Sequence, residues 1–145
     1  MCTDNEPKNN LHCALLYWSE FGDEPHLSLD AETFKRRHYT LQDFIKDIDV
    51  PILHNGQLYR YIVTTISYKI GDIINFDVPT SWSSNKQTVL DMSFGLQNAK
   101  ILIIKSNNLR GKFNIFNQYG ENEFIIIPLT MHVTKIDDNF IYVCV

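Results

Sequence analysis

The feature that most constrains the fold is a change of pattern at the Asn55-Gly56 turn. Before this turn, residues 11–21 and 29–49 carry apolar side chains at helical spacing, with Asp30 as the predicted N-cap of the second helix. After it come short runs rich in β-branched and aromatic residues, beginning with 57–67. Helices followed by a series of strands predict an α+β fold with a mostly antiparallel or mixed sheet.

The predicted strands are separated by turns and by one more helix. That helix is expected over 84–98, with core residues drawn from its apolar positions up to Phe94 and Leu96. The acidic turn at 137–139 predicts a hairpin between the last two strands. A chain of 145 residues suits one domain, so we expect 11–145 to form it, with 1–10 as a polar, disordered tail. The remaining strands are predicted over 73–78, 99–105, 113–116, 124–127, 131–136 and 140–145.

Composition excludes several classes of protein. The formal net charge of −4 argues against a general nucleic-acid or anionic-membrane binder. The sequence contains no apolar run long enough for a transmembrane helix and no signal-peptide pattern. Cys2, Cys13 and Cys144 are far apart, and the five histidines lack zinc-site spacing, so we expect no disulfide framework, no metal and a reducing, intracellular compartment. Rossmann and P-loop glycine motifs are absent from the sequence.

Two carboxylates stand one residue apart before the apolar run 124–127. If the strand includes Glu121 and Glu123, both side chains point to the same face, because side chains alternate along a strand. Like charges on one face repel each other unless a cation or a polar substrate lies between them. The pair is therefore either the solvated rim of a hairpin or part of a site that handles positive charge.

Two more features precede this pair. Arg60 lies in a predicted strand, and a guanidinium there suits phosphate oxygens, which it binds in a bidentate manner. The tripeptide Ser81-Trp82-Ser83 lies between a strand and a helix. Each also has a simpler interpretation: Arg60 as a surface ion-pair residue, Ser81 as a helix cap, and Trp82 as a core side chain.

The ordered triplet of Arg60, Ser81-Trp82-Ser83 and Glu121-Asn122-Glu123 resembles the mono-ADP-ribosyltransferases of the arginine–serine–glutamate class, the cholera-toxin-like group. The resemblance covers 41–145 and includes the run from 111–115 to Pro128. It implies a split sheet of the ADP-ribosyltransferase type, with NAD as substrate and nicotinamide as product. The chain departs from the family pattern at Trp82, where threonine is usual, and at Tyr61, where glycine is common.

The resemblance also implies a role for each motif residue. Glu123 would be the catalytic carboxylate, which stabilises the positive charge that develops on the ribose. Glu121 would position and deprotonate an acceptor guanidinium. Arg60 would anchor the NAD pyrophosphate, and Ser81 would hold Glu123 by a hydrogen bond.

The resemblance implies further roles in binding NAD, its nicotinamide ring and the acceptor arginine. Ser83 falls within the NAD-binding motif. Tyr119 falls in the target-recognition turn, where it could stack on an arginine. The nicotinamide needs an aromatic platform, for which Trp82, Phe94 and Phe116 are equal candidates.

We therefore expect an enzyme that transfers ADP-ribose from NAD to an arginine of a target protein, without a metal, a membrane or a nucleic-acid partner. An NAD glycohydrolase would need Glu123 but not Glu121, whereas a non-catalytic interaction domain would need neither. Transfer to a nucleic acid or a small molecule is a further alternative. The small size and the Asn- and Ile-rich composition favour a viral or bacterial effector in a host cytoplasm.

Overall fold

The computed structural model describes residues 10–21, 32–116 and 122–145, and it confirms the predicted α+β class. An eight-stranded sheet has the strand order β2-β7-β8-β4-β1-β3-β6-β5. The described helices are α1 (Asn10–Phe21), α3 (Glu32–Arg36), α4 (Leu41–Ile48) and α5 (Lys86–Ser93). The strands are β1 (Gln57–Val63), β2 (Ile73–Phe76), β3 (Thr80–Ser83), β4 (Ala99–Lys105), β5 (Gly111–Phe113), β6 (Glu123–Ile126), β7 (Leu129–Asp137) and β8 (Phe140–Cys144).

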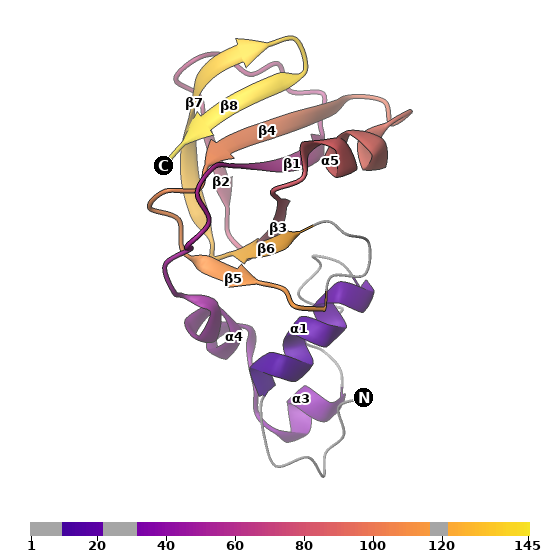
Figure 1. Ribbon diagram of the computed structural model, residues 1–145, viewed down its shortest axis with the longest axis vertical. Helices are drawn as coiled ribbons and strands as arrows, with labels where there is room; N and C mark the ends of the chain where they lie inside the picture. The colour runs from indigo at the N-terminus through magenta and orange to yellow at the C-terminus, as the bar shows by residue number, and fades with distance from the viewer. Residues whose placement is uncertain (1–9, 22–31, 117–121) are drawn as a thin grey trace.

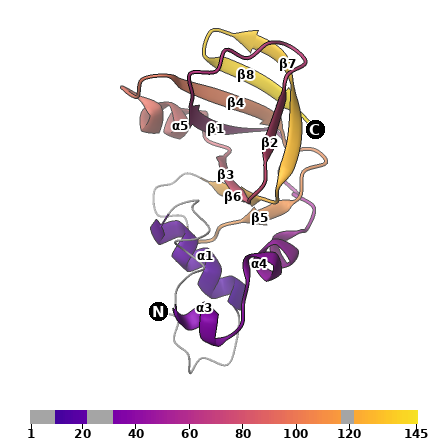
Figure 2. The same cartoon turned by 180° about the vertical axis from the view of Figure 1, so that it is seen from behind.

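The sheet splits between β1 and β3. Strand β1 pairs with β4 along its whole length, from Gln57 opposite Lys105 to Val63 opposite Ala99. With β3 it shares the single pair Tyr59–Ser83. Strands β3, β6 and β5 therefore diverge from the others and lie next to α1 in both views (Figures 1 and 2). All strand pairs are antiparallel except β4 with β8, so the sheet is mixed, as predicted.

Both faces of strand β4 are covered. Ile101 and Ile103 of β4 pack with Val89 of α5, whereas their neighbour Leu102 faces the opposite way, into the largest core cluster. This burial on both sides explains why β4 reads as a continuous apolar run. A third cluster packs α1, α3 and α4 against Ile125 of β6. The helical layer therefore rests on the strand that carries Glu123.

The predicted helix over 29–49 is divided in two. His38 has a φ of 55°, which lies in the left-handed region and interrupts the helix between α3 and α4. Thr40 caps α4, whereas the predicted cap, Asp30, lies outside the described residues. The predicted helix over 84–98 is also too long. It ends at Ser93, and Phe94 is 89% exposed, so its assignment to the core was wrong.

A capping box fixes the start of α4. The Thr40 hydroxyl accepts from the Asp43 backbone N–H at 3.2 Å, and the Asp43 carboxylate accepts from the Thr40 N–H at 2.9 Å. The Thr40 hydroxyl also donates to the Asp43 carboxylate, at 3.0 Å. The Thr40 backbone N–H first, and this hydroxyl second, hold the pKa of Asp43 below its ordinary value. Thr40→Ala is expected to lower the free energy of unfolding by about 1 kcal/mol in denaturant titrations. Gln42→Ala, an exposed change in the same helix, should alter it by less than about 0.5 kcal/mol.

Two further observations concern the predicted absence of a transmembrane helix and of disulfides. No described helix is long and apolar enough to cross a membrane. Cys13 in α1 is disulfide-bonded, although the spacing of the cysteines predicted no disulfide framework. Cys144 in β8 is free and exposed.

Candidate functional site

Glu123 is the first residue of β6, and the backbone turns sharply before it. Asn122 has a φ of 50°, in the left-handed region, so the alternation of a regular strand begins at Glu123. The prediction that Glu121 shares a face with Glu123 assumed a strand through both residues, and β6 begins at Glu123 among the described residues. Glu121 itself lies outside the described residues.

Glu123 is buried in a row of polar side chains. Ser83 of β3 lies directly opposite it, and on its other side the Asn114 backbone N–H donates to the Glu123 carbonyl at 2.9 Å. Residues paired across antiparallel strands project from the same face of a sheet. The exposed fractions are 8% for Glu123, 6% for Ser83 and 0% for Asn114. In Figure 1 these strands lie between α5 and α1.

The side chain of Asn114 holds the carboxylate. Its Nδ2 donates to Glu123 Oε1 at 2.7 Å, a charge-assisted contact between two buried groups. Sequence reasoning missed this residue, although Asn114 lies nine positions before Glu123, at a separation that a hairpin can bring together. The orienting role had been predicted for Ser81. Its Oγ instead accepts from the Trp18 indole Nε1–H at 2.7 Å, which ties β3 to α1.

Arg60 crosses the gap where the sheet splits. Its Nη1 donates to the Ser81 carbonyl at 3.0 Å, and its guanidinium carbon lies 5.4 Å from the centre of the Phe76 ring. Because Tyr59 faces the same way as its partner Ser83, Arg60 leaves β1 from the opposite face, by strand alternation. The structure thus places Arg60 beside the backbone of the serine motif rather than beside the side chain of Glu123.

The three aromatic candidates occupy different environments. Trp82 is 1% exposed and donates its indole N–H to Thr80 Oγ1, so its ring is a core side chain with no open face for a ligand. Phe94 lies at the exposed end of α5. Phe116 adjoins the polar row, because its backbone N–H donates to Asn114 Oδ1 at 3.0 Å. Tyr119 lies outside the described residues.

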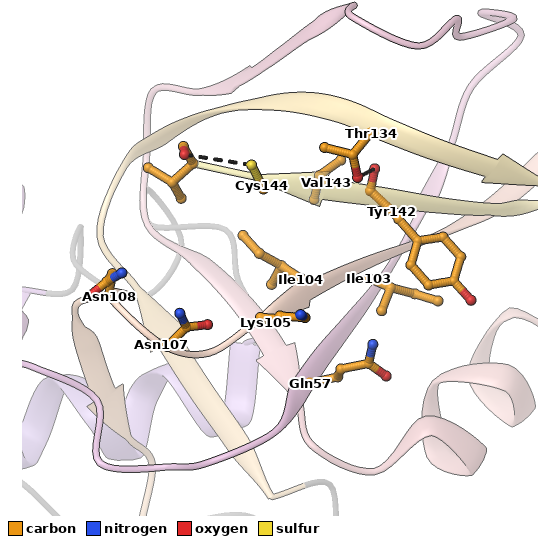
Figure 3. Close-up of a pocket in the computed structure, with 11 residues that line it drawn as sticks. Gln57, Ile103, Ile104, Lys105, Asn107, Asn108, Thr134, Tyr142, Val143 and Cys144 are labelled. Carbon is orange, nitrogen blue, oxygen red and sulfur yellow. Dashed lines mark hydrogen bonds between the residues drawn. The ribbon is translucent and has the colours of Figure 1, made fainter.

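A separate cavity of about 370 Å³ lies beside the C-terminal ends of β4 and β8 (Figure 3). Cys144 lies at this cavity, and its Sγ is 3.3 Å from His132 Nε2 on the neighbouring strand. The residues of the polar row, Ser83, Asn114 and Glu123, do not line this cavity. The cavity therefore does not belong to the predicted site. Its lining includes Gln57, Lys105, Asn107, Asn108, Tyr142 and Cys144.

Solved structures share this architecture. The eukaryotic mono-ADP-ribosyltransferase ART2.2 aligns with a TM-score of 0.65 and 18% identity, over 97% of this chain and 67% of that one. A mutant of ART2.2 in complex with NAD aligns at 0.61 and 19% identity, over 94% and 66% of the two chains. No protein-family model and no curated protein sequence matches this chain.

A bacterial toxin gives the same result. Vis toxin, an ADP-ribosyltransferase from Vibrio splendidus, aligns with a TM-score of 0.59 and 17% identity, over 94% of this chain and 72% of that one. The complex of Vis with agmatine aligns at 0.52 and 14% identity, over 93% and 67%. The chain therefore has the fold of the mono-ADP-ribosyltransferases, as its motif order predicted.

Proposed function

We propose that this protein transfers ADP-ribose from NAD to an arginine side chain of a target protein and releases nicotinamide. The observation that carries the proposal is the buried carboxylate of Glu123, fixed by Asn114 beside the serine motif. The fold supports it, because solved mono-ADP-ribosyltransferases share this architecture. The order of Arg60, Ser81 and Glu123 along the chain supports it independently.

The chemistry needs a fixed negative charge beside the ribose. When the bond between C1′ and the nicotinamide nitrogen breaks, its electron pair neutralises the pyridinium ring, and positive charge develops on the sugar. A carboxylate that is already held in place stabilises this charge without reorganisation, which is the role proposed for Glu123. The acceptor guanidinium then forms the new N–C1′ bond and loses a proton. The proposed base is Glu121, on the grounds of its place in the motif.

The other residues would bind the dinucleotide. Arg60 is proposed as the anchor of the pyrophosphate, since its planar guanidinium suits phosphate oxygens and is held by the Ser81 carbonyl where β1 and β3 separate. Phe116 is the proposed platform for the nicotinamide ring, because it is the one of the three aromatic candidates that adjoins the polar row. Burial of Trp82 removes it from this role.

The first experiment is an assay of nicotinamide release from NAD by the full chain. ART2.2 and Vis have been solved with NAD and with agmatine, respectively, so agmatine is a suitable acceptor for the assay. We expect release that agmatine accelerates, together with labelling of proteins in a host-cell lysate. If the protein released no nicotinamide with NAD alone, with agmatine or with lysate, and bound no NAD in calorimetry, the proposal would be overturned in favour of a non-catalytic domain.

A second experiment, with one variant, separates transfer to an acceptor from hydrolysis of NAD. Glu121→Gln should reduce ADP-ribosylation of agmatine by about 10²–10⁴-fold, the range for loss of a general base, while NAD hydrolysis persists. The two products, ADP-ribosylagmatine and free ADP-ribose, are separated by liquid chromatography. Equal loss of both products would contradict an acceptor-side role for Glu121. Release of ADP-ribose alone by the unmodified protein would favour a glycohydrolase.

A further inference from the structure

The amide of Asn114 makes hydrogen bonds through both its nitrogen and its oxygen. Nδ2 donates to Glu123 Oε1 at 2.7 Å and to the Leu15 carbonyl at 3.2 Å, and Oδ1 accepts from the Phe116 N–H at 3.0 Å. Its exposed fraction is 0%. Because the amide meets two oxygen acceptors on one side and an N–H donor on the other, a flipped amide would place its oxygen against two oxygens. The orientation of this side chain is therefore fixed.

The contact with Leu15 links the carboxylate to the N-terminal helix. The carbonyl of Leu15 belongs to α1, which packs against β6 through Ile125. The same helix donates the Trp18 indole N–H to Ser81. Helix α1 therefore contacts both β3 and Asn114, the residue that holds Glu123, and so supports the candidate site.

We propose that Asn114 is a positioning residue, which fixes the orientation of the Glu123 side chain by joining it to the main chain of α1. The assignment to catalysis rests on the proposed function, whereas the contact itself can be tested without activity. Asn114 would act through Glu123 and does not itself reach the reacting atoms. Its removal should therefore lower kcat and leave the binding of NAD nearly unchanged.

The first test is kinetic. In Asn114→Ala, kcat for nicotinamide release should fall about 10–100-fold, the effect of losing a hydrogen bond to a charged group, while KM for NAD changes less than about 3-fold. Asn114→Asp keeps the shape of the side chain but turns the donor into an acceptor, so it should lose at least as much. An unchanged kcat in both variants, with an active parent protein, would overturn the proposal and leave the proposed function standing.

A matched control removes a buried hydrogen bond elsewhere. Ser106, just after β4, is also 0% exposed, and its hydroxyl donates to the carbonyl of His54, just before β1, at 2.7 Å. Ser106→Ala should lower stability by an amount similar to Asn114→Ala, yet leave kcat unchanged. Rates are compared at a temperature at which denaturation curves show each variant folded. Equal losses of kcat in both alanine variants would show a general effect of stability and would overturn the positioning role.

The second test needs neither activity nor a variant of Asn114. In a ¹⁵N spectrum, the side-chain amide protons of Asn114 should move upfield when Glu123→Gln removes the charge from their acceptor. Asp137→Asn, an exposed change in the β7–β8 hairpin, should leave them in place. Amide resonances that do not respond to Glu123→Gln would overturn the proposed contact. If the amide responds but the parent protein releases no nicotinamide, the proposed function fails and the positioning contact stands.

Discussion

Glu123→Gln is expected to lower the rate of nicotinamide release by about 10²–10³-fold, the usual effect of removing one preorganised electrostatic group from a transition state. Glutamine keeps the shape of the side chain and still offers Oε1 to the Asn114 amide, so the buried row should stay intact. The change removes the negative charge that would face the ribose as positive charge develops there. The rate is measured at saturating NAD, and circular dichroism reports whether the fold is retained.

The control for this prediction removes a carboxylate that lies far from the row. Asp137 is exposed at the end of β7, and Asp137→Asn should leave the rate of nicotinamide release unchanged. If Glu123→Gln retained the full rate in a folded protein, Glu123 would not be the catalytic carboxylate. Another group would then have to stabilise the ribose cation.

Most strands were predictable because their patterns are local. The exceptions are β3, which was not among the predicted strands, and β5, which lies at Gly111–Phe113 rather than over 113–116. The run 99–105 forms β4, with residues 101–104 buried, and the acidic turn at 137–139 joins β7 to β8 as a hairpin. The helices were less well predicted. His38 adopts a left-handed backbone conformation, which the sequence does not predict at that position. The apolar residues after Ser93 suggested a longer helix, but Gly95, with a φ of 83°, belongs to the turn that leads into β4.

The candidate site was only partly predictable. Motif order along the chain predicted Glu123 and the serine motif as site residues, and the structure brings Ser83 and Glu123 together as cross-strand partners. Asn114 was not identifiable, because its importance comes from the register between β5 and β6 and from the carbonyl of Leu15, 99 residues earlier. Sequence spacing does not reveal which side chain faces which across strands. For the same reason, the hydroxyl of Ser81 was assigned to Glu123, although it contacts Trp18.

Arg60→Lys is expected to weaken NAD binding by about 10–100-fold, the effect of losing one or two hydrogen bonds between charged groups. Lysine retains the positive charge but loses the planar, bidentate donor set that suits a pyrophosphate. It also lacks the Nη1 donor that reaches from β1 to the Ser81 carbonyl, where the sheet splits. The dissociation constant is measured by calorimetry with NAD, and the stability of the variant by denaturant titration.

Arg110→Lys provides the matched control, because it makes the same exchange at an exposed arginine. Arg110 pairs with Asp49, and both side chains are more than 40% exposed, so the exchange should change NAD affinity and stability little. The pattern across NAD fragments locates the contact of Arg60. A pyrophosphate anchor predicts that Arg60→Lys weakens ADP-ribose as much as NAD and leaves nicotinamide inhibition unchanged. If instead the affinities for NAD and for ADP-ribose both stayed at the level of the parent protein, the contact of Arg60 with Ser81 would be structural, and the phosphates would need another cation.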